Sequence, residues 1–345
     1  MATIIDHDDA TALLAERDQP CEDLGVIGPV RERDLANLRR QPAQIRKTGV
    51  TVIVPCFNEE TMVAATVDAI ARTLSRAERP FEVIIIDDGS TDGTTSAIAT
   101  LSGRSHVTVL RNPRNRGYGY SLKRAVGEAR HELIAITDAD GTYPNERLDE
   151  LVALMTDADM VVGARTGNAV HVPMFRRPAK WALRRIAEYL AETRIPDLNS
   201  GMRVMKRSLI RRFLSILPDG FSFTTTITLA LLTHGYDVRY VSIDYAKRVG
   251  RSSIRPVRDT LNFFSLIVRT VMYFRPLKIF APASAAVFAT AVFVAIASKL
   301  ALGQVADVTA VTLASASIQL LAIGLLADLI DKRSPTNSAR GWNIE

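Results

Sequence analysis

The sequence predicts an α/β protein, a domain with a mostly parallel sheet that is followed by a membrane anchor. Between residues 49 and 164, short apolar runs alternate with helical stretches, which is the pattern of a parallel sheet with crossover helices. Near the C-terminus, residues 279–298 and 308–327 form two uncharged runs of 20 residues each. Each run is long enough to cross about 30 Å of hydrocarbon as a helix.

The predicted strands are short runs rich in valine and isoleucine. We expect strands at residues 50–55, 81–87, 106–110, 133–137 and 159–164, with helices near residues 59–76, 92–101, 119–130 and 146–155. No G-x-G-x-x-G segment follows the first strand, and the chain has no G-x-x-x-x-G-K-[ST] loop. The sequence therefore disfavours a dinucleotide-binding dehydrogenase and a P-loop NTPase.

Charge is unevenly distributed along the 345 residues. Residues 1–164 carry 18 basic and 26 acidic side chains, residues 165–212 carry 12 basic and 3 acidic, and residues 239–278 carry 9 basic and 2 acidic. Basic segments beside a membrane anchor favour anionic headgroups or phosphates over nucleic acid as partners. A basic surface that only contacts water is the alternative interpretation. Two cysteines give no disulfide framework, and five scattered histidines disfavour a zinc site or a histidine-based triad.

The chain divides into five segments by composition. We expect a partly ordered N-terminal extension without a signal peptide (1–48), a large α/β domain (49–254), an amphipathic juxtamembrane helix (255–277), a two-helix transmembrane hairpin (278–330) and a tail (331–345). A core-facing helix is the alternative for residues 255–277. Basic residues flank both spans on their outer sides, so the positive-inside rule places the α/β domain and both chain ends in the cytoplasm. The alanine-rich spans are also compatible with homo-oligomers.

Acidic segments follow three of the predicted strands. The first strand runs into "PCFNEE", the second into "DDGSTDGT" and the fourth into "DADGTYP". Because the carboxyl ends of parallel strands share one edge of a sheet, these carboxylates would repel one another there. Mg²⁺ or Mn²⁺ with bound phosphates would resolve that repulsion. Asp138 and Asp140 are therefore candidate ligands of a metal nucleotide, with turn formation and helix capping as the alternative roles for such residues.

The order of these motifs resembles a known family. "VIVPCFNEE", "IIIDDGSTDGT", "NRGYGYSLKRA", "DADGTYP", "VVGAR" and "LNSGMRVMKR" resemble family 2 glycosyltransferases of the Rossmann-like GT-A fold. The resemblance covers about residues 49–275 and is strongest to the polyisoprenyl-phosphate branch, which includes dolichol-phosphate mannose synthase and bacterial polyprenyl-phosphate glucosyltransferases. It implies inverting transfer of a hexose from a UDP- or GDP-sugar to a polyprenyl phosphate at the cytoplasmic membrane face.

The resemblance also implies a donor site. Residues matching the family's nucleotide-sugar site are Pro55, Phe57, Glu59, Asp88, Asp138 and Arg248. Phe57 stands where the family usually has tyrosine or another aromatic residue. Asp138 and Asp140 match the metal and diphosphate pair. Cys56 is given no catalytic role, because nothing in the sequence indicates a lowered thiol pKa.

An acceptor phosphate requires cations, and arginine suits phosphate geometry. The resemblance assigns the acceptor phosphate to Arg165, Arg176 or Arg177, Arg248 and Ser252. Ser253 replaces the family's lysine in "KRVGRSSIRP". Asp197 is the candidate carboxylate near the reacting centre, with a structural cap as its alternative role, and Arg203 is expected to pair with acidic residues or phosphate.

Three other functions stay open. A processive polysaccharide synthase shares the domain, but its Q-x-x-R-W motif is only faintly echoed by "RPAKW". A membrane-anchored binding protein with an inactive transferase domain would not need the intact acidic residues. A nucleotidyltransferase would need a glycine- and lysine-rich first loop, which this chain lacks.

Overall fold

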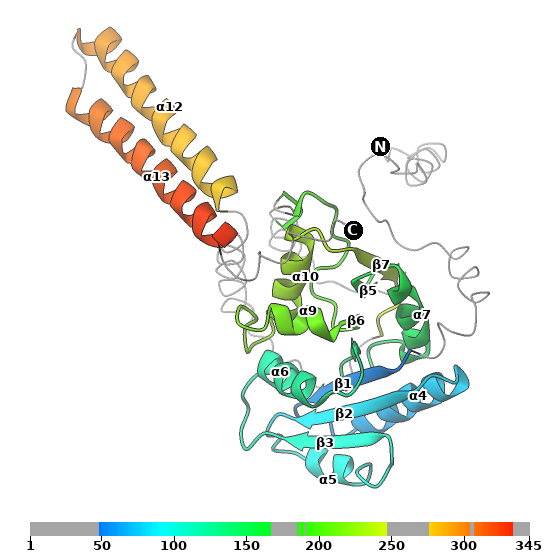
Figure 1. Ribbon diagram of the computed structural model, residues 1–345. Helices are drawn as coiled ribbons and strands as arrows, with labels where there is room; N and C mark the ends of the chain where they lie inside the picture. Colours follow the sequence, from blue (N-terminus) through cyan, green and yellow to red (C-terminus); the bar gives the residue numbers. More distant parts are fainter. Residues whose placement is uncertain are drawn as a thin grey trace, which may run out of the picture.

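The computed structural model describes residues 48–166, 185, 187–189, 191–246, 276–303 and 307–333. Figure 1 shows a sheet domain from which a long pair of helices extends. The predicted segments 1–48, 255–277 and 331–345 lie almost entirely outside the described residues, so their boundaries stay predictions.

The domain is built on one mixed sheet. Its strands are β1 (Val50–Cys56), β2 (Phe81–Asp87), β3 (Val107–Arg111), β4 (Leu133–Ile136), β5 (Met160–Ala164), β6 (Arg203–Lys206) and β7 (Val238–Ser242). Within the described residues the order is β3-β2-β1-β4-β6-β5-β7. All pairs are parallel except those that β6 makes with β4 and β5. The mostly parallel α/β fold and the first five strands are confirmed.

Strand β6 reverses direction between two parallel strands. Arg203, its first residue, lies opposite Ile136 of β4 and Val162 of β5. The start of β6 therefore lies between the carboxyl ends of β4 and β5, where the loops with Asp138 and Arg165 begin. The sequence predictions included neither β6 nor β7, because β6 is only four residues long and opens on a charged side chain.

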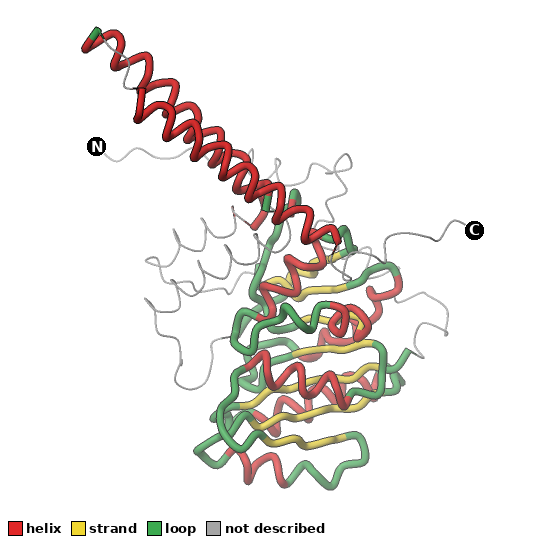
Figure 2. The backbone as a smooth tube through the Cα atoms, turned by 60° about the vertical axis from the view of Figure 1, so that its left-hand side comes forward, coloured by secondary structure: helices red, strands yellow, loops and turns green. Residues whose placement is uncertain are grey.

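Helices cover both faces of the sheet (Figures 1 and 2). They are α4 (Val63–Arg76), α5 (Thr94–Ala99), α6 (Tyr118–Glu128), η1 (Asn145–Arg147), α7 (Leu148–Ala153), η2 (Leu154–Thr156), α9 (Arg207–Arg212) and α10 (Phe223–Thr233). Helices α4, α5 and α7 share one apolar core with Val52 and Val54. Helices α6, α9 and α10 share the other core with Ile53 and Ile84. Successive strand residues thus fill opposite cores, as a sheet covered on both faces requires.

Two long apolar helices form the C-terminal hairpin. Helix α12 (Leu277–Leu302) and helix α13 (Asp307–Arg333) lie side by side in Figures 1 and 2. Their candidate membrane spans are Leu277–Ala301 and Val308–Ile330, which confirms the two predicted spans. The helices approach closely where Gly324 meets Phe280, because a Cβ atom on Gly324 would lie 2.5 Å from the Phe280 Cβ. The Ser284 hydroxyl donates a hydrogen bond across the pair to the Ser317 carbonyl, at 2.8 Å.

Lys278 attaches this hairpin to the sheet domain. Its Nζ lies 2.5 Å from Glu192 Oε1, donates to the Tyr189 carbonyl at 3.0 Å, and lies 5.2 Å from the centre of the Tyr189 ring. We name these three residues the hairpin contact. It joins the first turn of α12 to the chain segment that leads into Asp197.

The close contact at Gly324 generates a prediction. Gly324→Leu should lower the thermal unfolding midpoint of the protein in detergent micelles, because the added side chain must displace Phe280 and overpacking costs about 1–3 kcal/mol. Ala322→Leu is the matched control, because Ala322 is exposed on the same helix. Equal midpoints for the two variants, measured by circular dichroism, would contradict the close packing of α12 and α13.

Candidate active site

The carboxyl ends of β1, β2 and β4 bring acidic side chains together. Cys56, the last residue of β1, is buried among them. The pKa of its thiol is raised well above its ordinary value, first by burial and then by the negative charges of Asp87, Glu59 and Asp138. Acidic residues from the carboxyl ends of three strands therefore act on one buried sulfur atom. The raised pKa also gives Cys56 no nucleophilic character at neutral pH.

The first two acidic loops are hydrogen-bonded to each other. The amide of Asn58 donates to Ser90 Oγ at 3.0 Å, and its side-chain oxygen accepts from the amide of Thr91 at 2.9 Å. Asn58 adopts a left-handed backbone with φ of 58°, a conformation that asparagine tolerates better than most residues. The amide of Glu59 donates to Thr94 Oγ1 at 2.8 Å. Pro55 is buried in β1, Phe57 is half-buried just beyond it, and both lie beside this contact.

Asp88 holds a third loop in place. Its two carboxylate oxygens accept from the amides of Arg116 and Gly117 at 2.9 and 2.8 Å, and from the Asn112 side chain at 2.7 Å. Gly117, with φ of 103°, lets the chain turn into α6 at this point. Asp88 is 4% exposed. The hydrogen bonds of Asp88 thus give it a structural function. The base or ribose contact that we predicted for it stays a prediction.

Asp138 and Asp140 lie in the loop that follows β4. Asp140 is nearly buried, and its Oδ1 accepts from the amide and the hydroxyl of Thr142, at 3.1 and 2.6 Å. Asp138 is half-buried, and its carboxylate lies against Gly201, where a Cβ atom would come within 2.7 Å of Oδ2 and 2.9 Å of Oδ1. A side chain at residue 201 would therefore have to displace the Asp138 carboxylate.

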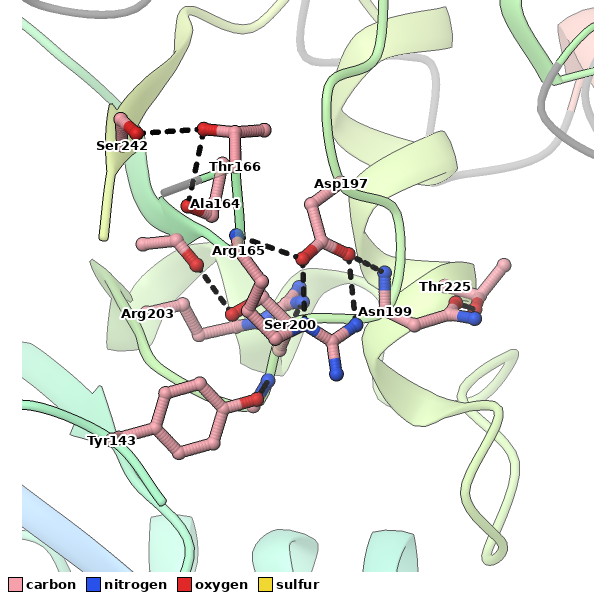
Figure 3. A network of polar contacts seen from close by, with 12 residues as sticks. Tyr143, Ala164, Arg165, Thr166, Asp197, Asn199, Ser200, Arg203, Thr225 and Ser242 are labelled. Carbon is pink, nitrogen blue, oxygen red and sulfur yellow. Dashed lines mark hydrogen bonds and ion pairs between the residues drawn. The ribbon is translucent and has the colours of Figure 1, made fainter. Parts of the chain in front are cut away.

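Residues 197–201 form a loop, here called the β6 loop, that leads into strand β6 (Figure 3). The Gly201 amide donates to the Tyr143 hydroxyl at 2.7 Å, and the Ser200 hydroxyl donates to the Gly163 carbonyl. Tyr143 is buried between the loops and its pKa is raised, first by burial and then by Asp138. The sequence predictions missed Tyr143 and Gly201, although both lie inside the quoted motifs "DADGTYP" and "NSGMR".

Arg165 and Asp197 form a two-pronged ion pair at the other end of the β6 loop. Arg165 Nε and Nη2 donate to the two carboxylate oxygens at 2.7 and 3.0 Å, and the Arg165 amide adds a third bond at 3.1 Å (Figure 3). The Asn199 amide donates to the same carboxylate at 3.1 Å. Burial opposes the charge of Asp197, but the Arg165 hydrogen bonds and charge outweigh it and hold the pKa of the carboxyl below its ordinary value.

These contacts bear on the predicted roles of the pair. A carboxylate with four donors and a lowered pKa is a weak base, so the geometry favours Asp197 as the residue that orients Arg165. The Asn199 bond also makes Asp197 the cap of a local turn, which was its predicted alternative role. The assignment of Arg165 to the acceptor phosphate stays a prediction.

The expectation for Arg203 was wrong. We expected it to pair with acidic residues or phosphate, but its side chain is fully buried. In the part of the chain that the structure describes, its hydrogen bonds go to the Ser200 and Thr224 carbonyls and the Thr228 hydroxyl. Burial lowers the pKa of Arg203. The residue lies inside the protein because β6 is inserted between two central strands, which the sequence did not predict.

Four predicted site residues lie outside the described residues. They are Arg176, Arg177, Arg248 and Ser252. In the structure, Glu59 and Asp138 both act on the Cys56 thiol at the carboxyl edge of the sheet, and Asp140 lies two residues beyond Asp138. Arg165, just after β5, pairs with Asp197. The β6 loop joins these two groups, which we name the acidic edge and the arginine pair.

The acidic edge has a donor set that fits a hard divalent cation. Within residues 48–166 and the other described ranges, no group of three or more histidine, cysteine, aspartate or glutamate side chains is arranged to hold a metal ion. Two adjacent carboxylates nevertheless suit Mg²⁺ or Mn²⁺, which are commonly held by one or two carboxylates and by substrate phosphate oxygens. Asp138 and Asp140 supply such a pair.

Comparison with known proteins gives the family. Residues 51–215 match the model of glycosyl transferase family 2, and residues 275–332 match the GtrB C-terminal hairpin. A dolichyl-phosphate hexose transferase of Haloferax volcanii is 30% identical over 210 residues, which are 60% of this chain and 87% of that protein. An undecaprenyl-phosphate 4-deoxy-4-formamido-L-arabinose transferase of Aeromonas hydrophila is 26% identical over 296 residues, 82% and 88% of the two chains.

Solved structures share the fold of the domain. Glucosyl-3-phosphoglycerate synthase from Mycobacterium tuberculosis, in complex with Mn²⁺, uridine diphosphate and phosphoglyceric acid, matches with a TM-score of 0.51 and 18% identity over 71% of this chain and 82% of its own. Mannosyl-3-phosphoglycerate synthase from Rubrobacter xylanophilus also has a TM-score of 0.51, with 21% identity over 69% and 76%. With its family 2 domain, its C-terminal hairpin and its acidic strand edge, the chain belongs to glycosyl transferase family 2 and is a glycosyltransferase.

Proposed function

We propose that this glycosyltransferase transfers a hexose from a nucleotide diphosphate sugar to a polyprenyl phosphate at the cytoplasmic face of a membrane, with inversion at the anomeric carbon. The observation that carries the proposal is the combination, in one chain, of the Asp138–Asp140 edge with a two-helix hairpin that contacts the segment leading into Asp197. The two relatives named above are transferases whose names specify dolichyl or undecaprenyl phosphate, which supports the same acceptor class here.

The donor side of the proposal rests on the acidic edge. Asp138 and Asp140 would hold Mg²⁺ or Mn²⁺ with the donor diphosphate, and the cation would supply positive charge to the departing nucleoside diphosphate. The fold relative with bound Mn²⁺ and uridine diphosphate supports a divalent metal. Pro55 at the end of β1 and Phe57, Glu59 and Asp88 in the loops beyond β1 and β2 are proposed to contact the nucleoside. Thr142 fixes one Asp140 oxygen, which leaves the carboxylate oriented before any ligand arrives.

The acceptor side rests on the arginine pair and the hairpin contact. The proposed acceptor has an anionic head on a chain that is confined to lipid, so its phosphate must be met close to the bilayer. Lys278, at the start of α12, bonds Tyr189 and Glu192. Asp197, which pairs with Arg165, follows Glu192 by five residues. Arg165 is thereby proposed to meet the phosphate, together with Arg176, Arg177, Arg248 and Ser252 from the segments outside the described residues.

The chemistry needs no strong protein base. A phosphate oxygen attacks the anomeric carbon, the bond from that carbon to the donor diphosphate breaks, and its electron pair leaves with the nucleoside diphosphate. The attacking phosphate is ionised near neutral pH, so no proton has to be removed from it. This agrees with Asp197, whose carboxylate is fully engaged by Arg165 and Asn199. Arg165 offsets the repulsion between the two phosphate-bearing substrates.

The first prediction tests the substrate class directly. Purified protein in detergent, given a short polyprenyl phosphate, Mg²⁺ or Mn²⁺ and a panel of UDP- and GDP-sugars, should form a glycolipid and release one nucleoside diphosphate per transfer. Glycolipid is scored by chromatography and nucleoside diphosphate by a coupled assay. A sugar polymer, or transfer to a sugar hydroxyl with polyprenyl phosphate left unused, would overturn the proposed acceptor and favour another membrane glycosyltransferase.

Removal of one acidic charge tests the metal ligands. Asp140→Asn should reduce transfer by about 10²-fold or more, because the variant keeps an oxygen for Thr142 but loses the charge that holds the cation. The unfolding midpoint should stay close to that of the wild type.

Asp159→Asn is the matched control for this prediction. Asp159 precedes the amino end of β5, whereas Asp140 follows the carboxyl end of β4. Asp159 bonds Lys206 and the Asp237 amide, so its variant should transfer sugar normally. Wild-type turnover by Asp140→Asn would reject the metal role of that residue.

The arginine pair generates a pH prediction. Because the pKa of folded Asp197 lies below its unfolded value of about 3.9, the pair stabilises the fold above that pH. Its contribution is lost as pH falls through the lower, folded pKa. Asp197→Asn should therefore lower the free energy of unfolding at pH 7 by about 3 kcal/mol, since it leaves Arg165 without its anion in a mostly buried place. The free energies of unfolding of wild type and variant should begin to converge below about pH 4, where unfolded Asp197 becomes protonated, and should meet only below the lower, folded pKa. Free energies of unfolding of wild type and variant that differ by the same amount at every pH from 3 to 7 would contradict the ion pair of Asp197 with Arg165.

A further inference from the structure

Arg203 is the charged side chain whose burial demands the strongest physical reason. It is 0% exposed, and within the described ranges its guanidinium bonds only neutral oxygens and lies 3.9 Å from the Met160 sulfur. Moving a cation out of water costs several kcal/mol when no anion accompanies it. A leucine or methionine would fill the same space without that cost. The hydrogen bonds that the guanidinium makes are therefore the physical reason for an arginine at this place.

Its hydrogen bonds connect two separate elements. Nε and Nη2 both donate to the Ser200 carbonyl in the β6 loop. Nη1 donates to the Thr224 carbonyl and the Thr228 hydroxyl in helix α10, at 3.0 and 2.9 Å. The planar guanidinium has donors in a fixed arrangement, so it sets the position of the β6 loop relative to α10. A second bond, from Thr225 Oγ1 to Asn199 Oδ1, links the same two elements (Figure 3).

The loop that Arg203 holds contacts both halves of the site. At one end, Gly201 lies against the Asp138 carboxylate and donates to the Tyr143 hydroxyl. At the other end, Asp197 holds Arg165 by two parallel hydrogen bonds. Arg203 itself lies opposite Ile136 and Val162, two and three residues before Asp138 and Arg165. It is thus the one buried cation of the described chain that lies between the acidic edge and the arginine pair.

We propose that Arg203 is a positioning residue that fixes the distance between the acidic edge, which takes the donor diphosphate, and the arginine pair, which takes the acceptor phosphate. The inference rests on the proposed function for the identity of the two substrates. Its physical content is that two anions must be held at a set separation for in-line attack, and that errors of about 1 Å in such a separation can cost about 10²-fold in rate.

Arg203→Met, which keeps the length of the side chain without its donors, is the first test. Nucleoside diphosphate with Mn²⁺, titrated by calorimetry, should bind within about threefold of wild type, because the acidic edge is intact. The kcat for transfer should fall about 10²-fold, with a smaller change in the KM for the donor. Arg203→Lys, which keeps the charge but not the planar arrangement of donors, should fold and recover about tenfold of the lost kcat.

Arg79→Met is the matched control. Arg79 is also buried, and it bonds Asp149 and the Thr48 carbonyl beside the amino ends of β1 and β2. Its loss should lower the unfolding midpoint and leave kcat and both KM values unchanged. A purely structural function for Arg203 predicts the same result for Arg203→Met as for Arg79→Met, and that outcome would overturn the proposal. So would a wild-type kcat in Arg203→Lys together with a wild-type kcat in Arg203→Met.

A readout without substrate separates this proposal from the proposed function. Amide hydrogen exchange in a peptide spanning residues 197–202 should accelerate at least tenfold in Arg203→Met, while exchange in β1 stays at the wild-type rate. If wild-type protein uses no polyprenyl phosphate but the exchange result is obtained, only the acceptor assignment fails. Unchanged exchange in the β6 loop would refute the positioning role whatever the substrates are. Where Arg203→Met fails to fold, the kcat and exchange rate of Arg203→Lys decide, and wild-type values for both refute the proposal.

Discussion

Negative charge gathered at one edge of the sheet is the constraint on which the rest of this structure depends. Glu59, Asp87 and Asp138 all act on the buried Cys56 thiol. The protein offsets their repulsion with donors of its own chain. Backbone amides of Ser90, of Arg116 and Gly117, and of Thr142 bond Asp87, Asp88 and Asp140. Fixed amide dipoles of this kind stabilise negative charge, so the fold itself lowers the cost of gathering carboxylates at this edge.

The positive side of the site is organised differently. Arg165 is held by a carboxylate rather than by backbone groups, and Asp197 sets both the direction and the charge of its guanidinium. An arginine already paired in this way is oriented before any ligand arrives, which would lower the entropy cost of binding the proposed acceptor phosphate. Its Tyr245 neighbour, with the ring centre 5.2 Å from Cζ, adds a cation–π contact that restricts the side chain further. Preorganisation is thus common to both halves, although the means differ.

The sequence predicted those parts of the fold that depend on local pattern. The strands up to Ala164 are continuous apolar runs and the two membrane spans are long and uncharged, so their positions follow from composition. Asp138 and Asp140 were found for the same reason, because a strand running into two carboxylates is a local signal. Contacts between distant residues gave no such signal. Arg165 and Asp197 are 32 residues apart, and nothing in either segment indicates that they meet.

Arg203 shows why the remaining part could not be predicted. Arginine in a short segment normally indicates a surface strand or a ligand contact, and the antiparallel insertion of β6 reverses that expectation. Burial of its side chain follows from sheet order, which is set by all the strands together. Once β6 lies between β4 and β5, its first residue must lie between the loops of Asp138 and Arg165.

The hairpin extends the same chain of contacts to the membrane. Lys278 bonds the segment at Tyr189 and Glu192, which continues to Asp197 and then through the β6 loop to Gly201 and Asp138. A lipid-bound acceptor varies little in its depth in the bilayer, so the catalytic groups need a fixed height above it. A contact between the anchor and the domain helps to set that height, because a flexible linker alone would let the domain tilt. A bond from the first turn of α12 to the segment that leads into Asp197 therefore suits the proposed acceptor, whose phosphate stays at the membrane, more than the proposed soluble donor, which arrives from any direction.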